Sequence, residues 1–174
     1  GHNGREETPT MCLIPHVRRK TSLPLIAAGG IGTGAGMLAA FALGAEGVQI
    51  GTRFALTTES SAHEAFKQLC LSLNEGDTKL LLKKVSPTRL VKGTFTTAVE
   101  EAESRGATVE ELRELLGKGR AKKGIFEGNL EEGELEIGQI ASLFREELSV
   151  ADVMKEIISD FNQGMEQIRN LTSF

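Results

Sequence analysis

The fold is decided by residues 24–52, which read PLIAAGGIGTGAGMLAAFALGAEGVQIGT. The apolar run at residues 23–28 has no polar face and ends at a Gly-Gly pair, which is typical of a strand covered on both faces of a parallel sheet. Small apolar residues at 34–43 predict a helix that a glycine closes. A second short apolar run, at 47–50, ends at a Gly-Thr pair. The order strand, glycine turn, helix, strand, glycine turn predicts a βαβ unit and an α/β fold class.

Hydrophobic periodicity predicts helices around this unit. We expect them, in chain order, at residues 10–20, from Ser60-Ser61 to about Leu73, in two pieces broken near Gly106 within 97–116, at 137–148, and after Ser149-x-x-Asp152. That last motif is a capping box. The inner face of the helix it opens should carry Val150, Val153, Met154, Ile157, Ile158 and Phe161. Residues 79–93, which contain Pro87, fit neither a helical nor a strand pattern.

Composition excludes several classes of protein. A net charge of −4 offers no basic field for nucleic acid or for an anionic membrane. No apolar stretch approaches the roughly 20 residues that cross a bilayer. Cys12 and Cys70 have no partner at metal-ligand spacing, so we expect no metal site and two free thiols in a reducing cytoplasm.

The two glycine turns suggest an anion site. Turns without side chains at the carboxyl ends of neighbouring strands let backbone N–H groups approach an anion, and the helix that follows each turn adds its positive end. Thr52 adds a hydroxyl and Gln49 an amide, and Arg53 is a further candidate partner of a phosphate. Glycine turns also serve to pack a strand against a helix, and spacing alone leaves both interpretations open.

The residues that form these turns also resemble a known family. The segments PLIAAGGI at 24–31 and LGAEGVQIGTRF at 43–54 resemble the flavin barrels of the nitronate monooxygenase family, formerly called 2-nitropropane dioxygenases, which includes the FMN-dependent enoyl-acyl-carrier-protein reductases of type II. The resemblance continues through residues 58–63 and returns at 127–129 and 133–143. Residues 1–4 resemble the second half of that family's Gly-Gly-His-x-Gly loop.

The resemblance implies an FMN-binding (β/α)8 TIM barrel in which the two predicted strands are the last two. Residues 1–73 would then hold the C-terminal βα units with the FMN phosphate site, and residues 74–174 would form a mostly helical C-terminal region. The resemblance assigns His2 as the catalytic acid or base. It assigns cofactor binding to Gly1, Gly29, Gly30, Gln49, Ile50, Gly51 and Thr52.

Length departs from the family pattern, because a single-chain barrel of this kind needs about 250 residues and this chain has 174. Two strands cannot close a barrel, and their edges would be unpaired. We therefore expect the C-terminal part of a longer protein whose N-terminal half completes the barrel.

Three functions stay open at this stage. The first is NAD(P)H-dependent reduction of trans-2-enoyl-acyl-carrier-protein in fatty acid synthesis, with FMN as cofactor and NAD(P)H as co-substrate. It is favoured because the segment GQIASL at 138–143 looks closer to that branch. The second is oxidation of alkyl nitronates with O2. The third is a truncated fragment, or a phosphate-binding scaffold, without activity of its own. Expected partners are a small-molecule or carrier-protein-bound substrate in the cytoplasm, and the oligomeric state stays open, with a homodimer as one option.

Overall fold

The βαβ unit is present. The structure, a computed structural model, describes residues 8–171. Strand β1 (Ile26–Ala28) is followed by helix α2 (Gly34–Ala42) and strand β2 (Gly47–Gln49), and the strands pair in parallel from Ile26↔Gly47 to Ala28↔Gln49. Helix α1 (Thr10–Arg18) precedes β1 and packs against it and against α2. The predictions for this part of the chain are confirmed.

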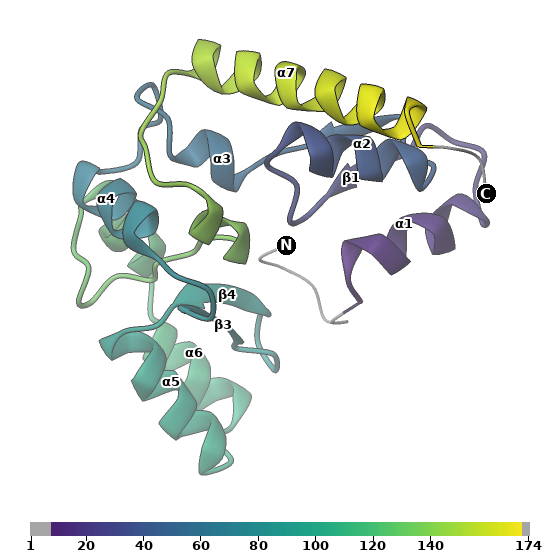
Figure 1. Cartoon of the computed structure of the whole chain (residues 1–174). Helices are drawn as coiled ribbons and strands as arrows, with labels where there is room; N and C mark the ends of the chain where they lie inside the picture. The colour runs from purple at the N-terminus through teal and green to yellow at the C-terminus, as the bar shows by residue number, and fades with distance from the viewer. Residues whose placement is uncertain (1–7, 172–174) are drawn as a thin grey trace.

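Helix α7 (Val150–Arg169) lies along α2, as the upper part of Figure 1 shows. The two backbones come so close at Gly34 that a Cβ there would overlap the carbonyl oxygen of Ile157 and the amide nitrogen of Phe161. The Phe41 and Phe161 rings meet edge to face with centroids 5.8 Å apart. A segment more than one hundred residues later in the chain therefore covers the first βα unit.

Between β2 and α7 the chain forms a second group of elements (Figure 1). In chain order these are α3 (Thr52–Ala55), α4 (Glu64–Ser72), the antiparallel hairpin β3 (Thr78–Leu81) and β4 (Thr88–Val91), α5 (Thr94–Ser104), α6 (Val109–Leu116), a π-helical turn at Lys122–Phe126 and a 3-10 turn at Gln139–Leu143. The two helices predicted within 97–116 are present, and the break at Gly106 is confirmed.

Two expectations about the positions of helices were wrong. The helix expected at 137–148 is only the 3-10 turn, because the chain becomes extended at Phe144 (φ −108°, ψ 138°), whose side chain is buried. Helix α4 begins at Glu64 rather than after Ser60-Ser61, because the Nδ1 atom of His63 accepts a hydrogen bond from the Ala65 N–H at 3.1 Å.

The inner face of α7 is also narrower than its pattern predicts. Val153 and Ile157 are buried, whereas Val150, Met154 and Ile158 are 36%, 43% and 51% exposed. The helix rests on α2 and α3 along one side only, so the flanking apolar positions face outward.

The hairpin occupies the segment that the sequence left unassigned. Its strands turn through residues 82–87, where Leu82 has a positive φ of 57° and is fully buried. Leu90 and Val91 of β4 are buried as well. The predicted division at residue 73 stays a prediction. Contacts cross it, since α4 packs on the 3-10 turn and α2 packs on α7.

One face of the two-stranded sheet is open. Ala27 is buried against the helices, whereas Ile26 is 57% exposed and Ala28 and Gln49 are exposed. Alternation of this kind gives the strands one covered and one open face. None of the helices within residues 8–171 is long and apolar enough to span a bilayer.

Gly34→Ala should destabilise the protein by about 1–3 kcal/mol, because the added methyl group must push α7 off α2. Urea unfolding measures the loss. Gly36→Ala is the matched control in the same helix, since its new Cβ would meet the Thr33 hydroxyl at 3.3 Å and Ile31 at 3.7 Å, with no overlap with the backbone of α7. Equal stability of the two variants would contradict the close approach.

Burial raises the pKa of the Glu134 carboxyl from 4.5 to about 7, and the nearby Glu136 carboxylate adds to the rise. Between those pH values the folded state keeps a proton that the unfolded state has released. The free energy of unfolding should therefore fall as pH rises from about 4.5 to 7. Glu134→Gln should remove this fall and be more stable than the parent by about 1–2 kcal/mol at pH 8. Glu101→Gln, which removes an exposed carboxylate from α5, is the control for the change in charge.

Candidate functional site

The first glycine turn follows β1 directly. Gly29 and Gly30 have φ values of +102° and +72°, which side chains with a Cβ rarely adopt. The Thr10 hydroxyl donates a hydrogen bond of 2.6 Å to the Gly29 carbonyl oxygen and so ties α1 to the turn. A Cβ placed on Gly30 would meet nothing within 4 Å, so its backbone borders open space.

The second turn lies beside the first. Because β1 and β2 are parallel and Ala28 pairs with Gln49, the two turns leave the sheet at the same level. Gly51 caps α3 with a φ of −98°, which any residue adopts, and a Cβ there would also meet nothing within 4 Å. The N–H groups in the first turn of a helix have no intrahelical acceptor. The structure therefore places two open glycines and a helix start side by side.

The expectation that both following helices contribute their positive ends was half wrong. The N–H of Ala35 in α2 donates to the Asp160 carboxylate at 2.8 Å, and the N–H of Gly36 donates to the Thr33 hydroxyl at 3.0 Å. A carboxylate from α7 already occupies this helix end. The start of α3, at Thr52, is the end that stays open.

Thr52 links the site to the distant 3-10 turn. Its hydroxyl oxygen accepts a hydrogen bond of 3.1 Å from the Gly138 N–H, and its own O–H is left to donate elsewhere. Gln49, at the end of β2, is exposed on the open face of the sheet.

Arg53 does not turn toward the glycine turns. Its guanidinium forms an ion pair with Glu156 of α7 and lies over the Phe144 ring, with the guanidinium carbon 4.2 Å from the centroid. These contacts hold α3 against α7. Arg53 is therefore a structural residue, and the suggestion that it binds the phosphate was wrong for the site as built.

An open cavity of about 770 Å³ begins at Gly30. Its other wall comes from the hairpin, the turn before the hairpin and the 3-10 turn. The residues on that wall are Glu75, Gly76, Thr78, Arg89, Gln139, Ile140, Ser142, Leu143 and Arg145. Sequence reasoning missed Arg89 and Arg145, which lie in an unassigned segment and in a wrongly predicted helix.

The predictions for Gly1, His2 and the two cysteines have different outcomes. Gly1 and His2 lie outside the described residues, so their predicted roles stay predictions. No group of three or more potential metal ligands occurs in the described part of the chain. Cys12 is exposed, and burial raises the pKa of the Cys70 thiol to about 12, which makes it an inert thiol.

The donor set suits the phosphate end of a flavin mononucleotide. Among the described residues the two glycines border open space, and neither the first N–H groups of α3 nor the Thr52 O–H has an acceptor. Within residues 8–171 no side chain fills the space above either glycine, and the carboxylate of Asp160 is turned to the other helix. A phosphate needs such donors and no nearby negative charge.

Comparison with known proteins places the chain in a family. Residues 1–160 match the family described as nitronate monooxygenase. The chain belongs to the nitronate monooxygenase family. A "Probable nitronate monooxygenase" of Bacillus subtilis (strain 168) is 33% identical over 158 residues, which cover 90% of this chain and 45% of that protein. One from Staphylococcus haemolyticus is 49% identical over 69 residues.

Solved structures agree on the fold. FabK from Thermotoga maritima superposes with a TM-score of 0.89 at 35% identity, over 99% of this chain and 54% of that one. A nitroalkane oxidase from Streptomyces ansochromogenes gives a TM-score of 0.72 at 25% identity, over 91% and 45%. The α/β barrel-type fold class and the family resemblance are confirmed. The chain spans about half the length of the Bacillus subtilis relative and of the two solved structures.

Thr52→Val should destabilise the protein by about 1–3 kcal/mol, because it leaves the half-buried Gly138 N–H without its acceptor. Hydrogen exchange at the Gly138 amide should quicken in this variant. Thr52→Ser keeps the hydroxyl and should retain the protection. Unchanged exchange in Thr52→Val would show that the link between α3 and the 3-10 turn is not formed.

Proposed function

We propose that the whole protein is an FMN-dependent oxidoreductase whose cofactor phosphate is bound by the turns at Gly29–Gly30 and Ile50–Thr52. The observation that carries this proposal is the pair of open glycines at the ends of two hydrogen-bonded parallel strands. In barrels of this class the loops after strands seven and eight commonly hold a phosphate. Membership of the nitronate monooxygenase family supports the same cofactor.

The roles of the chain's own residues follow from their positions. Backbone N–H groups of Gly30 and Gly51 donate to the phosphate, and the Thr52 hydroxyl adds a third donor while it anchors the 3-10 turn. Gln49 lies on the exposed face of the sheet, where its amide is free to contact the ribityl chain. Gly1, Gly29 and Ile50 complete the backbone around the cofactor.

His2 is proposed as the acid or base of the reaction. A neutral imidazole with an ordinary pKa near 6.5 takes or gives a proton close to neutral pH. In reduction of an enoyl thioester it gives the proton that the α-carbon receives, and in nitronate oxidation it handles the proton at carbon.

The reaction we favour is NAD(P)H-dependent reduction of trans-2-enoyl-acyl-carrier-protein. FMN, when bound, relays the hydride between the nicotinamide and the β-carbon of the substrate. Two observations support this reaction. Residues 138–143 resemble the reductase branch of the family, and two of them, Gln139 and Ser142, line the cavity that begins at Gly30. A role in fatty acid synthesis in the cytoplasm belongs to the same proposal.

Nitronate oxidation is the second candidate. The curated relatives are named probable nitronate monooxygenases, and one similar structure is a nitroalkane oxidase. A third candidate is that the 174-residue chain alone is inactive, because its parallel sheet has only two strands among the described residues and the edges of that sheet lack the strands that would close a barrel.

The full-length protein distinguishes these candidates. Its flavin spectrum is recorded, and anaerobic bleaching by NADH or NADPH is followed before crotonyl thioester or propyl-2-nitronate is added. Rapid bleaching by the dinucleotide and reoxidation by the thioester are expected. Bleaching by the nitronate alone would favour the monooxygenase, and a colourless protein would overturn both flavin functions.

Gly51→Ala isolates the phosphate site. Because Gly51 has an ordinary φ and open space beside it, a methyl group there should leave the fold unchanged while intruding on the phosphate. We expect FMN to bind at least about tenfold more weakly, a loss of about 1.4 kcal/mol, measured by fluorescence titration of the full-length protein. Gly93→Ala is the matched control, since a Cβ there also meets nothing within 4 Å, at the far end of the hairpin. Unchanged FMN affinity in Gly51→Ala would contradict the proposed site.

A further inference from the structure

The cavity that begins at Gly30 carries two arginines on its far wall, and the FMN phosphate site does not account for them. Arg89 comes from β4 and Arg145 from the extended segment after the 3-10 turn. Among the described residues of the lining the one acidic group is Glu75, an exposed residue at the tip of the turn before the hairpin. The charged side chains of the lining therefore sum to one positive charge.

One nitrogen of the Arg89 guanidinium is hydrogen-bonded, and another has no partner among the described residues. One of its terminal nitrogens, Nη1, donates to the Thr78 hydroxyl at 3.3 Å across the hairpin. Its Nε atom is buried and has no hydrogen-bond partner among the described residues. A buried N–H without an acceptor destabilises a folded protein by about 1–3 kcal/mol. A ligand oxygen that accepted this hydrogen bond would remove that destabilisation.

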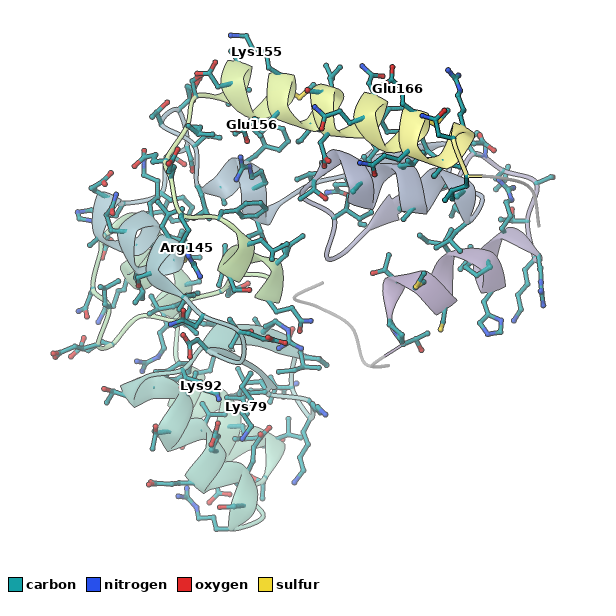
Figure 2. The ribbon with its side chains drawn as sticks, viewed as in Figure 1. Lys79, Lys92, Arg145, Lys155, Glu156 and Glu166 are labelled. Carbon is teal, nitrogen blue, oxygen red and sulfur yellow. The ribbon has the colours of Figure 1, made fainter. Side chains whose placement is uncertain are left out.

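Arg145 is positioned from the opposite side. Its Nη1 atom donates to the carbonyl oxygens of Leu73, Leu71 and Phe144, at 2.7, 3.2 and 3.3 Å. The first two lie at the C-terminal end of α4. These bonds fix the plane of the guanidinium and use one of its three nitrogens, which leaves Nη2 and Nε as donors. Figure 2 shows Arg145 between the hairpin and the helices above it.

The contacts that anchor the two arginines are to neutral oxygens, the Thr78 hydroxyl for Arg89 and backbone carbonyls for Arg145. Two guanidinium groups, each anchored by its own backbone or hydroxyl partner and each with spare donors, suit a ligand with several oxygen acceptors. Phosphate esters and diphosphates have that chemistry, and arginine binds them in two-pronged fashion.

We propose that Arg89 and Arg145 bind the phosphate groups of a second substrate, in the part of the cavity opposite the FMN phosphate turns. This inference rests on the proposed flavoenzyme function and deepens it. The phosphate comes either from the diphosphate of a nicotinamide dinucleotide or from the phosphopantetheine arm of a thioester. Gly30 at the other end of the cavity places the ligand next to the cofactor.

The assignment separates the two candidate reactions. A simple alkyl nitronate is a small anion that carries no phosphate and needs no second pair of arginines. A dinucleotide and a pantetheine thioester both carry phosphate at a distance from the reacting carbon, where binding energy fixes orientation without touching the chemistry.

The test measures binding, not turnover. ADP-ribose and 4′-phosphopantetheine are titrated by calorimetry into the FMN-loaded full-length protein, and into its Arg89→Gln, Arg145→Gln and Arg145→Lys variants. We expect each Gln variant to weaken at least one of the two ligands tenfold or more and the Lys variant to recover part of the loss. FMN affinity should stay unchanged. Lys92→Gln is the matched control, because it removes a positive charge from the end of the same hairpin outside the cavity lining.

Loss of ADP-ribose binding alone identifies the dinucleotide as the ligand, and loss of phosphopantetheine binding alone identifies the thioester. If both ligands bind the Gln variants as tightly as the parent, or if Lys92→Gln weakens them as much, the assignment is overturned. Arg89→Gln keeps the test valid should Arg145→Gln fail to fold. A protein that purifies without FMN would contradict the flavoenzyme function instead, so the two failures are distinguishable.

Discussion

The close approach of α7 to α2 at Gly34 is the contact on which the remaining structure depends. A sheet of two strands of three residues has little stability of its own, and α7 covers the helix that joins those strands. The same contact brings Asp160 to the N-terminus of α2. One helix end is thereby neutralised by the protein, and the start of α3 becomes the end at which an exogenous anion finds free donors.

A second link connects this unit to the hairpin region. The Thr52 hydroxyl holds Gly138, and the 3-10 turn that begins one residue later lines the cavity at Gly30. Arg53 ties the same short helix to α7 through Glu156. The four residues of α3 therefore join the glycine turns, the C-terminal helix and the far wall of the cavity. A substitution that shifts any of these three should alter the geometry of the proposed phosphate site.

The sequence was sufficient where local chemistry sets the structure. The apolar runs, the closing glycines and the Ser149 cap predicted β1, α2, β2 and α7 within a few residues. The glycine turns suggested an anion site, which stays a prediction. Contacts between distant segments could not be predicted from the sequence. Nothing local shows that Asp160 occupies α2, that Phe144 is pulled into the core and ends the 3-10 turn, or that Arg89 and Arg145 face one cavity. The hairpin was missed because Leu82 adopts a left-handed conformation that its residue type disfavours.

The central claim is that the phosphate of FMN lies between the two glycine turns and the start of α3. A crystal structure of the full-length protein with FMN tests it most directly. The account predicts phosphate oxygens within hydrogen-bond distance of the N–H groups of Gly30 and Gly51 and of the Thr52 hydroxyl, with Asp160 still bound to Ala35. A phosphate bound elsewhere, or a cofactor that displaces Asp160 from α2, would contradict it.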